Sequence, residues 1–210
     1  SYNKIKEIST GYVFFINLLN LSHNNISSFL NLYTSFLTLD LSFNNLTSIS
    51  LLSIHNLLLN NNNLEIIFCN INDQNNLLKE IKEDDFSKFF YLIELDLSIN
   101  NLSKIDSNAF RDLKSLKYLN LSFNKLRFLE KNITKPLISL KTFELSHNQI
   151  KYLEDESFFS LNYLFSLYLN HNIFNQINNI TFAGLRSIKD ITISKEIFLT
   201  IPSFNEALVQ

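Results

Sequence analysis

The chain has 210 residues, of which 46% are hydrophobic and 13% aromatic, so a disordered chain is excluded and a large core can form. Its 18 basic and 20 acidic residues leave a net charge of −2, which predicts neither nucleic acid nor anionic lipid as a partner. The longest apolar runs are too short to cross a bilayer, so no membrane contact is expected within this segment.

One short pattern recurs along the chain and decides the predicted fold. The chain opens on SYNKIKEI, which matches the second half of a repeat. Repeats of the form LxxLxLxxNxLxxL follow. Their ninth residues are Asn24, Asn44, Asn62, Asn100, Asn124, Asn148 and Asn172, and the last four are 24 residues apart. A final repeat over residues 188–201 has Glu196 in place of the asparagine.

The register breaks between Asn62 and Asn100, which are 38 residues apart. We interpret the region near residues 68–80 as an insertion or a very degenerate repeat, and either a binding loop or a tolerated surface loop would fit it. Cys69 lies there and has no second cysteine to pair with. Residues 1–210 are thus predicted to form a single domain of about eight repeats plus a partial first one, truncated at both ends.

Each repeat predicts one short strand whose alternate side chains face the core. In LIELDLSINNL, Leu95 and Leu97 should point inward. Glu94, Asp96 and Ser98 should point outward. Successive strands stacked about 4.8 Å apart would form a parallel sheet over a continuous core. The asparagine suits the following turn, where its amide can bond backbone groups and link the repeats in a buried ladder.

The second half of each repeat predicts the opposite, convex side. Apolar residues ten and thirteen positions after the asparagine should fill the core from there: Phe110, Phe158, Phe182, Leu113, Leu137, Leu161 and Leu185. These segments are too short for regular helices. The predicted fold class is therefore an α/β repeat solenoid, a horseshoe with a parallel β-sheet on its concave face and loops or short helical turns on its convex face.

The pattern identifies the chain as a member of the leucine-rich-repeat superfamily over nearly its whole length. Its 24-residue form, NxLxxIxxxxFxxLxxLxxLxL, resembles the typical animal subfamily, and the irregular repeat lengths with an insertion resemble Toll-like receptor ectodomains most. The resemblance implies a macromolecule-binding module of an extracellular or cell-surface receptor in signalling or innate immunity. Its partner would be a protein or microbial ligand, and it could dimerise through the solenoid. An adhesion or matrix protein and an intracellular scaffold remain alternatives.

Ligands in this family usually meet the concave sheet or its edge, so the outward strand residues are the candidate ligand-binding residues. They are Asp40, Glu94, Asp96, Tyr118, Asn120, Thr142, Glu144, Ser166, Tyr168 and Asp190. Three acidic members, Asp40, Asp96 and Glu144, fall in one column, and tyrosines nearby can serve as anchors. The set is either a site for a basic or polar protein surface or an ordinary solvated sheet exterior.

Three histidines, His23, His147 and His171, share the position just before the asparagine. The last two, on consecutive repeats, could form a pH-sensitive pair or half of a metal site, or could be placed there by chance. No cofactor or metal is expected. No GxSxG, GxxxxGK[ST], HExxH or CxxC pattern occurs, so the chain is not expected to be an enzyme.

Seven Asn-x-Ser/Thr acceptor sequences occur, and most arise from the repeat itself. Asn132 and Asn179 lie outside the strand pattern and are the better candidates for glycosylation. A glycan on either residue would place the chain in the secretory pathway.

Overall fold

The computed structural model describes residues 7–9, 15–30, 35–42, 44, 48–50, 54–58, 66–68, 80–83, 85–87, 89–175 and 177–194. Most of the region predicted as an insertion, including Cys69, lies outside these residues, as do Asn62 and Glu196.

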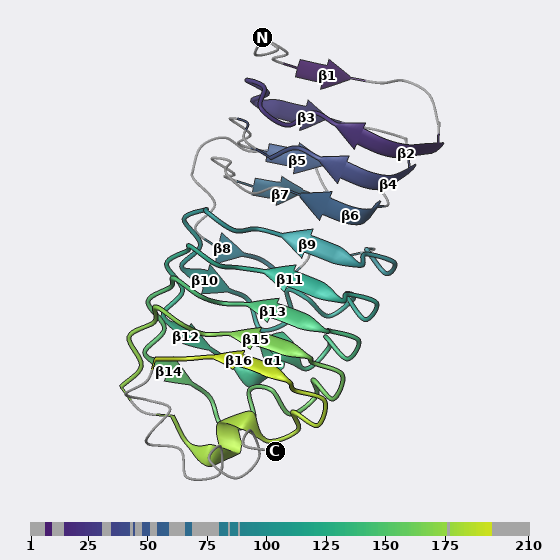
Figure 1. Cartoon of the computed structure of the whole chain (residues 1–210). Coiled ribbons are helices and arrows are strands. Elements are labelled where there is room, and N and C mark those ends of the chain that lie inside the picture. The colour runs from purple at the N-terminus through teal and green to yellow at the C-terminus, as the bar shows by residue number, and fades with distance from the viewer. Residues whose placement is uncertain are drawn as a thin grey trace.

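Eight parallel strands, one from each repeat, form the main sheet (Figure 1). They are β2 (Phe15–Asn20), β4 (Ser35–Asp40), β6 (Ile54–Leu58), β9 (Glu94–Asp96), β11 (Tyr118–Asn120), β13 (Thr142–Glu144), β15 (Ser166–Tyr168) and β16 (Asp190–Thr192). Their order in the sheet follows their order in the chain, as stacked repeats require. The predicted parallel sheet of a repeat solenoid is confirmed.

Smaller parallel sheets form where the chain leaves each turn, and the sequence pattern did not predict them. One contains β1 (Glu7–Ser9), β3 (Ser28–Leu30), β5 (Ser48–Ser50) and β7 (Ile66–Phe68); two others pair β8 (Glu80–Ile81) with β10 (Lys104–Ile105) and β12 (Phe128–Leu129) with β14 (Tyr152–Leu153). The described helices are single turns, α1 (Lys131–Thr134) and the 3₁₀ turn η1 (Asn179–Phe182). Short helical turns and loops therefore cover the convex side, as predicted.

The main sheet continues without a gap across the break in the repeat pattern. Strand β6 pairs directly with β9, with Leu57 opposite Leu95. Within the described residues, β7 pairs with β5 and β8 with β10, so these strands belong to two separate small sheets. The extra length of this repeat thus leaves the register of the main sheet intact between β6 and β9.

The core is the one that the repeat predicts. Leu95 and Leu97 are fully buried, as are Phe110 and Phe158 on the convex side. The rings of Phe158 and Phe182 stack with centroids 5.9 Å apart, so the phenylalanines of these two neighbouring repeats pack against each other. Each such side chain buries enough apolar surface to contribute about 1.5–3 kcal/mol.

The asparagines form the predicted ladder. Asn124 Nδ2 donates to the carbonyl of Leu121 in its own repeat and to that of Leu97 in the preceding one, both at 3.0 Å. Its Oδ1 accepts the N–H of Leu102 at 3.0 Å. Asn148 bonds the preceding and its own repeat in the same way. One amide therefore bonds backbone groups of two repeats, and two successive asparagines share the carbonyl that lies between them.

The outward orientation predicted for Ser98 is wrong. Its side chain is buried, as are Ser42, Ser122 and Ser146 at the same position. The strand ends at Asp96, and the Ser98 N–H then donates to Asp96 Oδ1 at 2.9 Å, which closes a turn. The alternation of a strand no longer applies beyond that turn, so only two residues of each repeat reliably face outward.

Candidate functional site

The strand register aligns residues of successive strands in columns, and two of these columns contain the ten candidate residues. The first column is Leu18, Thr38, Asn56, Glu94, Tyr118, Thr142, Ser166 and Asp190. The second column is Asn20, Asp40, Leu58, Asp96, Asn120, Glu144, Tyr168 and Thr192. All ten candidate residues therefore lie on one face.

Acidic and uncharged residues alternate along part of the second column. In the second column Leu58 separates Asp40 from Asp96, and Asn120 separates Asp96 from Glu144. Carboxylates two strands apart are about 9.6 Å from each other along the sheet. Tyr118 lies between the strands of Asp96 and Glu144, and we call these three residues the central acidic cluster.

Several second-column residues also hold the turn that follows their strand. Asp40 Oδ1 accepts the N–H and the hydroxyl of Ser42 at 3.0 and 2.6 Å. Asn120 Oδ1 accepts the same two groups of Ser122 at 3.0 and 2.7 Å. Short Asp and Asn side chains suit this turn. Glu144 is one methylene longer, and its carboxylate bonds no residue that the structure describes, which leaves it available to a partner.

The electrostatics of the central acidic cluster favour a positive partner. Burial, then the charges of Asp96 and Glu144, raise the pKa of the Tyr118 hydroxyl to about 12. Burial also raises the pKa of Asp96, and burial and Asp96 together raise the pKa of Glu144. Among the described side chains no lysine or arginine forms an ion pair with the cluster. A cationic group placed there would relieve the repulsion among these groups.

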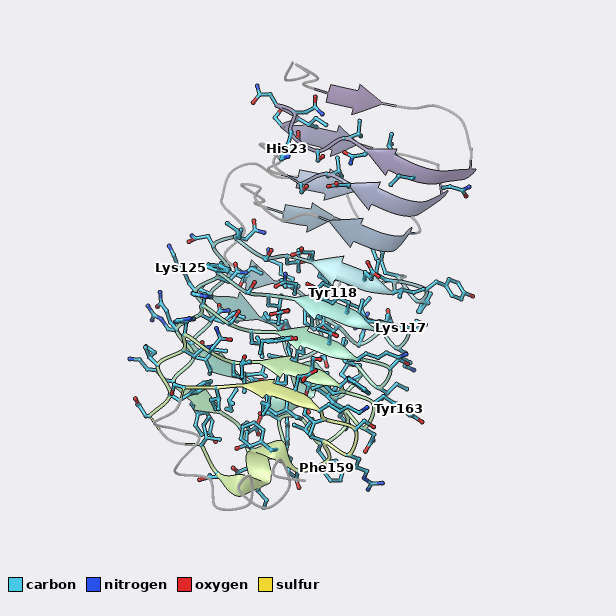
Figure 2. The ribbon with its side chains drawn as sticks, viewed as in Figure 1. His23, Lys117, Tyr118, Lys125, Phe159 and Tyr163 are labelled. Atoms are coloured by element: carbon cyan, nitrogen blue, oxygen red, sulfur yellow. The ribbon has the colours of Figure 1, made fainter. Side chains whose placement is uncertain are left out.

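A row of lysines borders the same sheet. Lys117, Lys141 and Lys189 are exposed and immediately precede β11, β13 and β16, and we call them the basic edge. The Nζ of Lys189 lies 4.5 Å from the centre of the Phe165 ring, which precedes β15. Figure 2 shows Lys117 at this edge and Lys125 at the opposite one. Acidic and basic side chains are thus segregated on the surface although the net charge is only −2. The 24-residue spacing of Lys117 and Lys141 indicates the basic edge in the sequence.

The turns after the strands carry a stack of aromatic rings. The ring of His147 lies 4.0 Å from Phe123 and 4.1 Å from His171, nearly parallel to both, and we call these residues the ring stack. All three have the left-handed backbone, with φ of 53 to 56°. Burial, then the charge of His171, lowers the pKa of His147. Stacked imidazoles do not direct their nitrogens at one point, and the described residues include no group of three potential metal ligands.

The two better glycosylation candidates differ in what the structure describes. Asn132 is exposed on α1. Asn179 belongs to η1, but its side chain lies outside the described part. Neither lies on the face of the main sheet.

An open sheet of stacked repeats, held by asparagines and lined by polar groups, is typical of solenoids that bind other macromolecules. The leucine-rich repeat family model matches residues 73–126 and 138–196, more than half of the chain. The chain belongs to the leucine-rich repeat family. Members of this family are typically binding modules rather than catalysts. No curated protein matches the chain.

Among solved structures, the chain is similar in fold to a chain in the Drosophila Toll–Spätzle complex, a molecular hub in development and innate immunity. The TM-score is 0.63 and the sequence identity 24%, over 83% of this chain. The chain spans only 28% of the length of that Toll–Spätzle chain, and at this identity the likeness shows the fold alone. No described helix is long and apolar enough to cross a membrane.

Proposed function

We propose that the chain is the ligand-binding part of an extracellular or cell-surface receptor of the Toll-like kind, acting in signalling or innate immunity. The observation that carries this proposal is the central acidic cluster, Asp96, Tyr118 and Glu144, on the face of a rigid sheet. The family supplies protein-binding modules, and the fold likeness to a chain of the Toll–Spätzle complex supports a protein ligand.

The charge pattern defines the partner further. A basic segment of the ligand lies against the central acidic cluster, and an acidic segment lies along the basic edge. Such opposed patches speed association and fix orientation. Tyr118, half-buried between two carboxylates, provides a rigid anchor whose hydroxyl stays protonated and can donate a hydrogen bond.

The test uses the full-length parent protein expressed in animal cells. A photo-crosslinking amino acid at Thr142 captures the partner bound to the sheet, and the captured protein is then purified. Its Kd is measured against the wild type, Glu144→Lys and a matched control, Asp155→Lys, whose carboxylate is exposed outside the sheet. We expect Glu144→Lys to weaken binding at least about tenfold, roughly 1.4 kcal/mol. Equal effects of the two substitutions would refute the assignment of this face.

The same face would serve an adhesion or matrix protein, or an intracellular scaffold. Surface labelling of intact cells separates these, because a receptor ectodomain or an adhesion protein is labelled and a scaffold is not. A signalling change after the purified ligand is added then separates receptor from adhesion protein. Dimerisation through the solenoid belongs to the same proposal and is measured as the mass of the full-length ectodomain with and without ligand.

A further inference from the structure

A cavity of about 210 Å³ opens between α1 and the turn at residues 155–160. It is lined by Lys131, Asn132, Lys135, Glu156, Phe159 and Ser160. Cavities for drug-sized molecules are larger, about 300–1,000 Å³. This one suits a single ring with several polar groups, because one wall is aromatic and the others carry charged or hydroxyl groups.

The aromatic wall is held in place by the next repeat. Phe159 keeps 54% of its surface exposed. Its backbone packs against Gly184, where an added Cβ would overlap the Phe159 carbonyl oxygen. Figure 2 shows Phe159 at the end of the described solenoid. An exposed ring on a fixed backbone offers an apolar face on which the C–H groups of a sugar can lie.

The opposite wall is also structured. Glu156 has a φ of 63°, a conformation that costs a non-glycine residue of order 1–3 kcal/mol. Lys131 Nζ lies 3.9 Å from Glu156 Oε2, across the mouth of the cavity. The Lys131 N–H donates to Glu154 Oε2 at 2.8 Å, which ties α1 to the neighbouring turn. The polar groups around the cavity are therefore positioned before any ligand arrives.

Asn132 begins the acceptor sequence Asn132-Ile133-Thr134, and the fold treats its two polar residues differently. Thr134 is buried, and its Oγ1 lies 3.0 Å from the Lys131 carbonyl oxygen. Asn132 is exposed and lines the cavity, and its amide bonds no residue that the structure describes. The threonine is needed only while the chain is unfolded, and after folding the asparagine alone presents its amide to solvent.

We propose that Asn132 carries an N-linked glycan whose first N-acetylglucosamine ring lies in this cavity against Phe159. In the transfer, Asn132 Nδ2 forms a bond to C1 of the sugar and loses one proton. The bond from C1 to oxygen of a polyprenyl pyrophosphate donor breaks, and the pyrophosphate leaves with the electron pair. Glu156 and Lys135 then bond the hydroxyl and acetamide groups of the ring.

This assignment separates Asn132 from the acceptor sequences on the sheet. Asn120 lies on the ligand face, and its side chain already bonds Ser122. A glycan at Asn132 leaves that face open and covers the side opposite to it. The inference rests on the proposed location of the chain outside the cell, since glycan transfer occurs in the secretory pathway.

The experiment uses the full-length parent from animal cells. Peptide mapping reports occupancy at Asn132. The glycoprotein is then either trimmed to one N-acetylglucosamine or cleared completely, and hydrogen exchange is measured in peptides covering residues 131–135 and 155–160. We expect the single sugar to slow exchange there several-fold relative to the cleared protein. Phe159→Ala should abolish this difference, whereas Tyr163→Ala, which removes an exposed ring elsewhere, should preserve it.

Each failure has a distinct meaning. If Asn132 carries a glycan but the single sugar does not change hydrogen exchange, the sugar does not bind in the cavity. That result leaves the proposed function intact. An empty Asn132 beside occupied acceptor sites elsewhere overturns the site alone. A parent protein without any glycan and confined to the cytosol overturns both the site and the proposed function.

Discussion

At the scale of single residues, position in the repeat decides the role of each polar side chain. The asparagine after each strand is buried and bonds two repeats. The last residue of β4 and of β11 closes the turn that follows the strand, as Asp40 and Asn120 do. Glu144 occupies the equivalent position without that task. The sheet thus distinguishes structural polar groups from those available to a ligand.

Substitution of Asn148 by alanine tests the structural role of the buried asparagine amide. The change leaves the N–H of Leu126 buried without its partner. It also removes one of the two amide donors to each of the carbonyls of Leu121 and Leu145, which the ladder asparagines of the neighbouring repeats still bond. The unpaired N–H costs about 1–3 kcal/mol and each of the two lost hydrogen bonds about 0.5–1.5 kcal/mol, so with some relaxation we expect a loss of about 2–4 kcal/mol. Urea unfolding measures it. Gln149→Ala, at an exposed neighbour, should change stability by less than about 0.5 kcal/mol.

Glu144→Gln tests the carboxylate that is available to a ligand, and we expect this substitution to increase stability at neutral pH. Burial and Asp96 raise the pKa of Glu144, so its ionised form is less favourable in the folded than in the unfolded chain. Wild-type stability is therefore lost as pH rises through this pKa. At neutral pH the variant should be more stable by up to about 1 kcal/mol, since the group is partly exposed. At a pH below the ordinary glutamate pKa the two should unfold alike, and a destabilised variant at neutral pH would contradict the argument.

The sequence predicts the core and the asparagine ladder because both depend on residue type at a fixed spacing. It does not predict the left-handed backbone at Ile99 and Phe123, since these residue types normally avoid a positive φ. Hydrogen bonds between repeats hold that backbone; the Phe123 N–H, for example, donates to the Ser146 carbonyl at 3.1 Å. The sequence also does not predict that the Asp40 carboxylate is hydrogen-bonded and that of Glu144 is not. The turn in which Asp40 bonds Ser42 is a feature of the folded chain.

At the scale of the elements, each repeat is fixed by contacts with the next, and the ring stack and Gly184 are the clearest cases. The left-handed backbone brings Phe123, His147 and His171 into one column. Gly184 lets one convex turn lie directly on another. Neither contact could be predicted from one repeat alone, because each depends on how two repeats meet.

Replacement of Gly184 by alanine should disrupt the contact between the last convex turns. Its φ is +91°, and the new Cβ would overlap the Phe159 backbone. The strained backbone alone costs of order 1–3 kcal/mol, so we expect a loss of at least that size in thermal or urea unfolding. Arg186→Ala, at an exposed residue of the same turn, is the matched control and should have little effect.

His171→Phe tests the ring stack. The variant keeps an aromatic ring beside His147 but removes the charge that helps to lower its pKa. Burial remains as the larger cause, so the pKa of His147 should rise only part of the way toward its ordinary value. In wild type, the stability that neutral His147 contributes is present above the unfolded pKa and is lost as pH falls through the folded one. An NMR titration that found the same or a lower pKa in the variant would show that the rings are not coupled.

At the scale of the whole molecule, the solenoid separates the face of the main sheet, where we propose that the ligand binds, from the side of Asn132, where we propose the glycan. The main sheet is acidic at its centre and basic along one edge, whereas the cavity beside Asn132 opens away from it. The parallel sheet follows from the repeat pattern, but this distribution of charge does not, because it depends on which residues from different repeats lie side by side. A net charge of −2 is therefore compatible with strong local fields.

Charge reversal at the basic edge tests that distribution. Lys141→Glu places a carboxylate beside the sheet and should slow association of the purified ligand, with a smaller effect on dissociation, because an exposed charge acts mainly by steering. The difference should shrink as salt is raised, since exposed charges are screened. Lys151→Glu, at an exposed lysine outside the basic edge, is the control in stopped-flow measurements. An effect on dissociation alone would contradict steering.

Hydroxyl-radical footprinting of the full-length parent, with and without its purified ligand, tests the central claim most directly. Tyr118 and Tyr168 lie on the face of the main sheet, and Tyr152 lies on β14 outside it. We expect the ligand to protect Tyr118 and Tyr168 from oxidation and to leave Tyr152 unchanged. Protection of Tyr152 with continued oxidation of Tyr118 and Tyr168 would show that the ligand binds elsewhere on the solenoid.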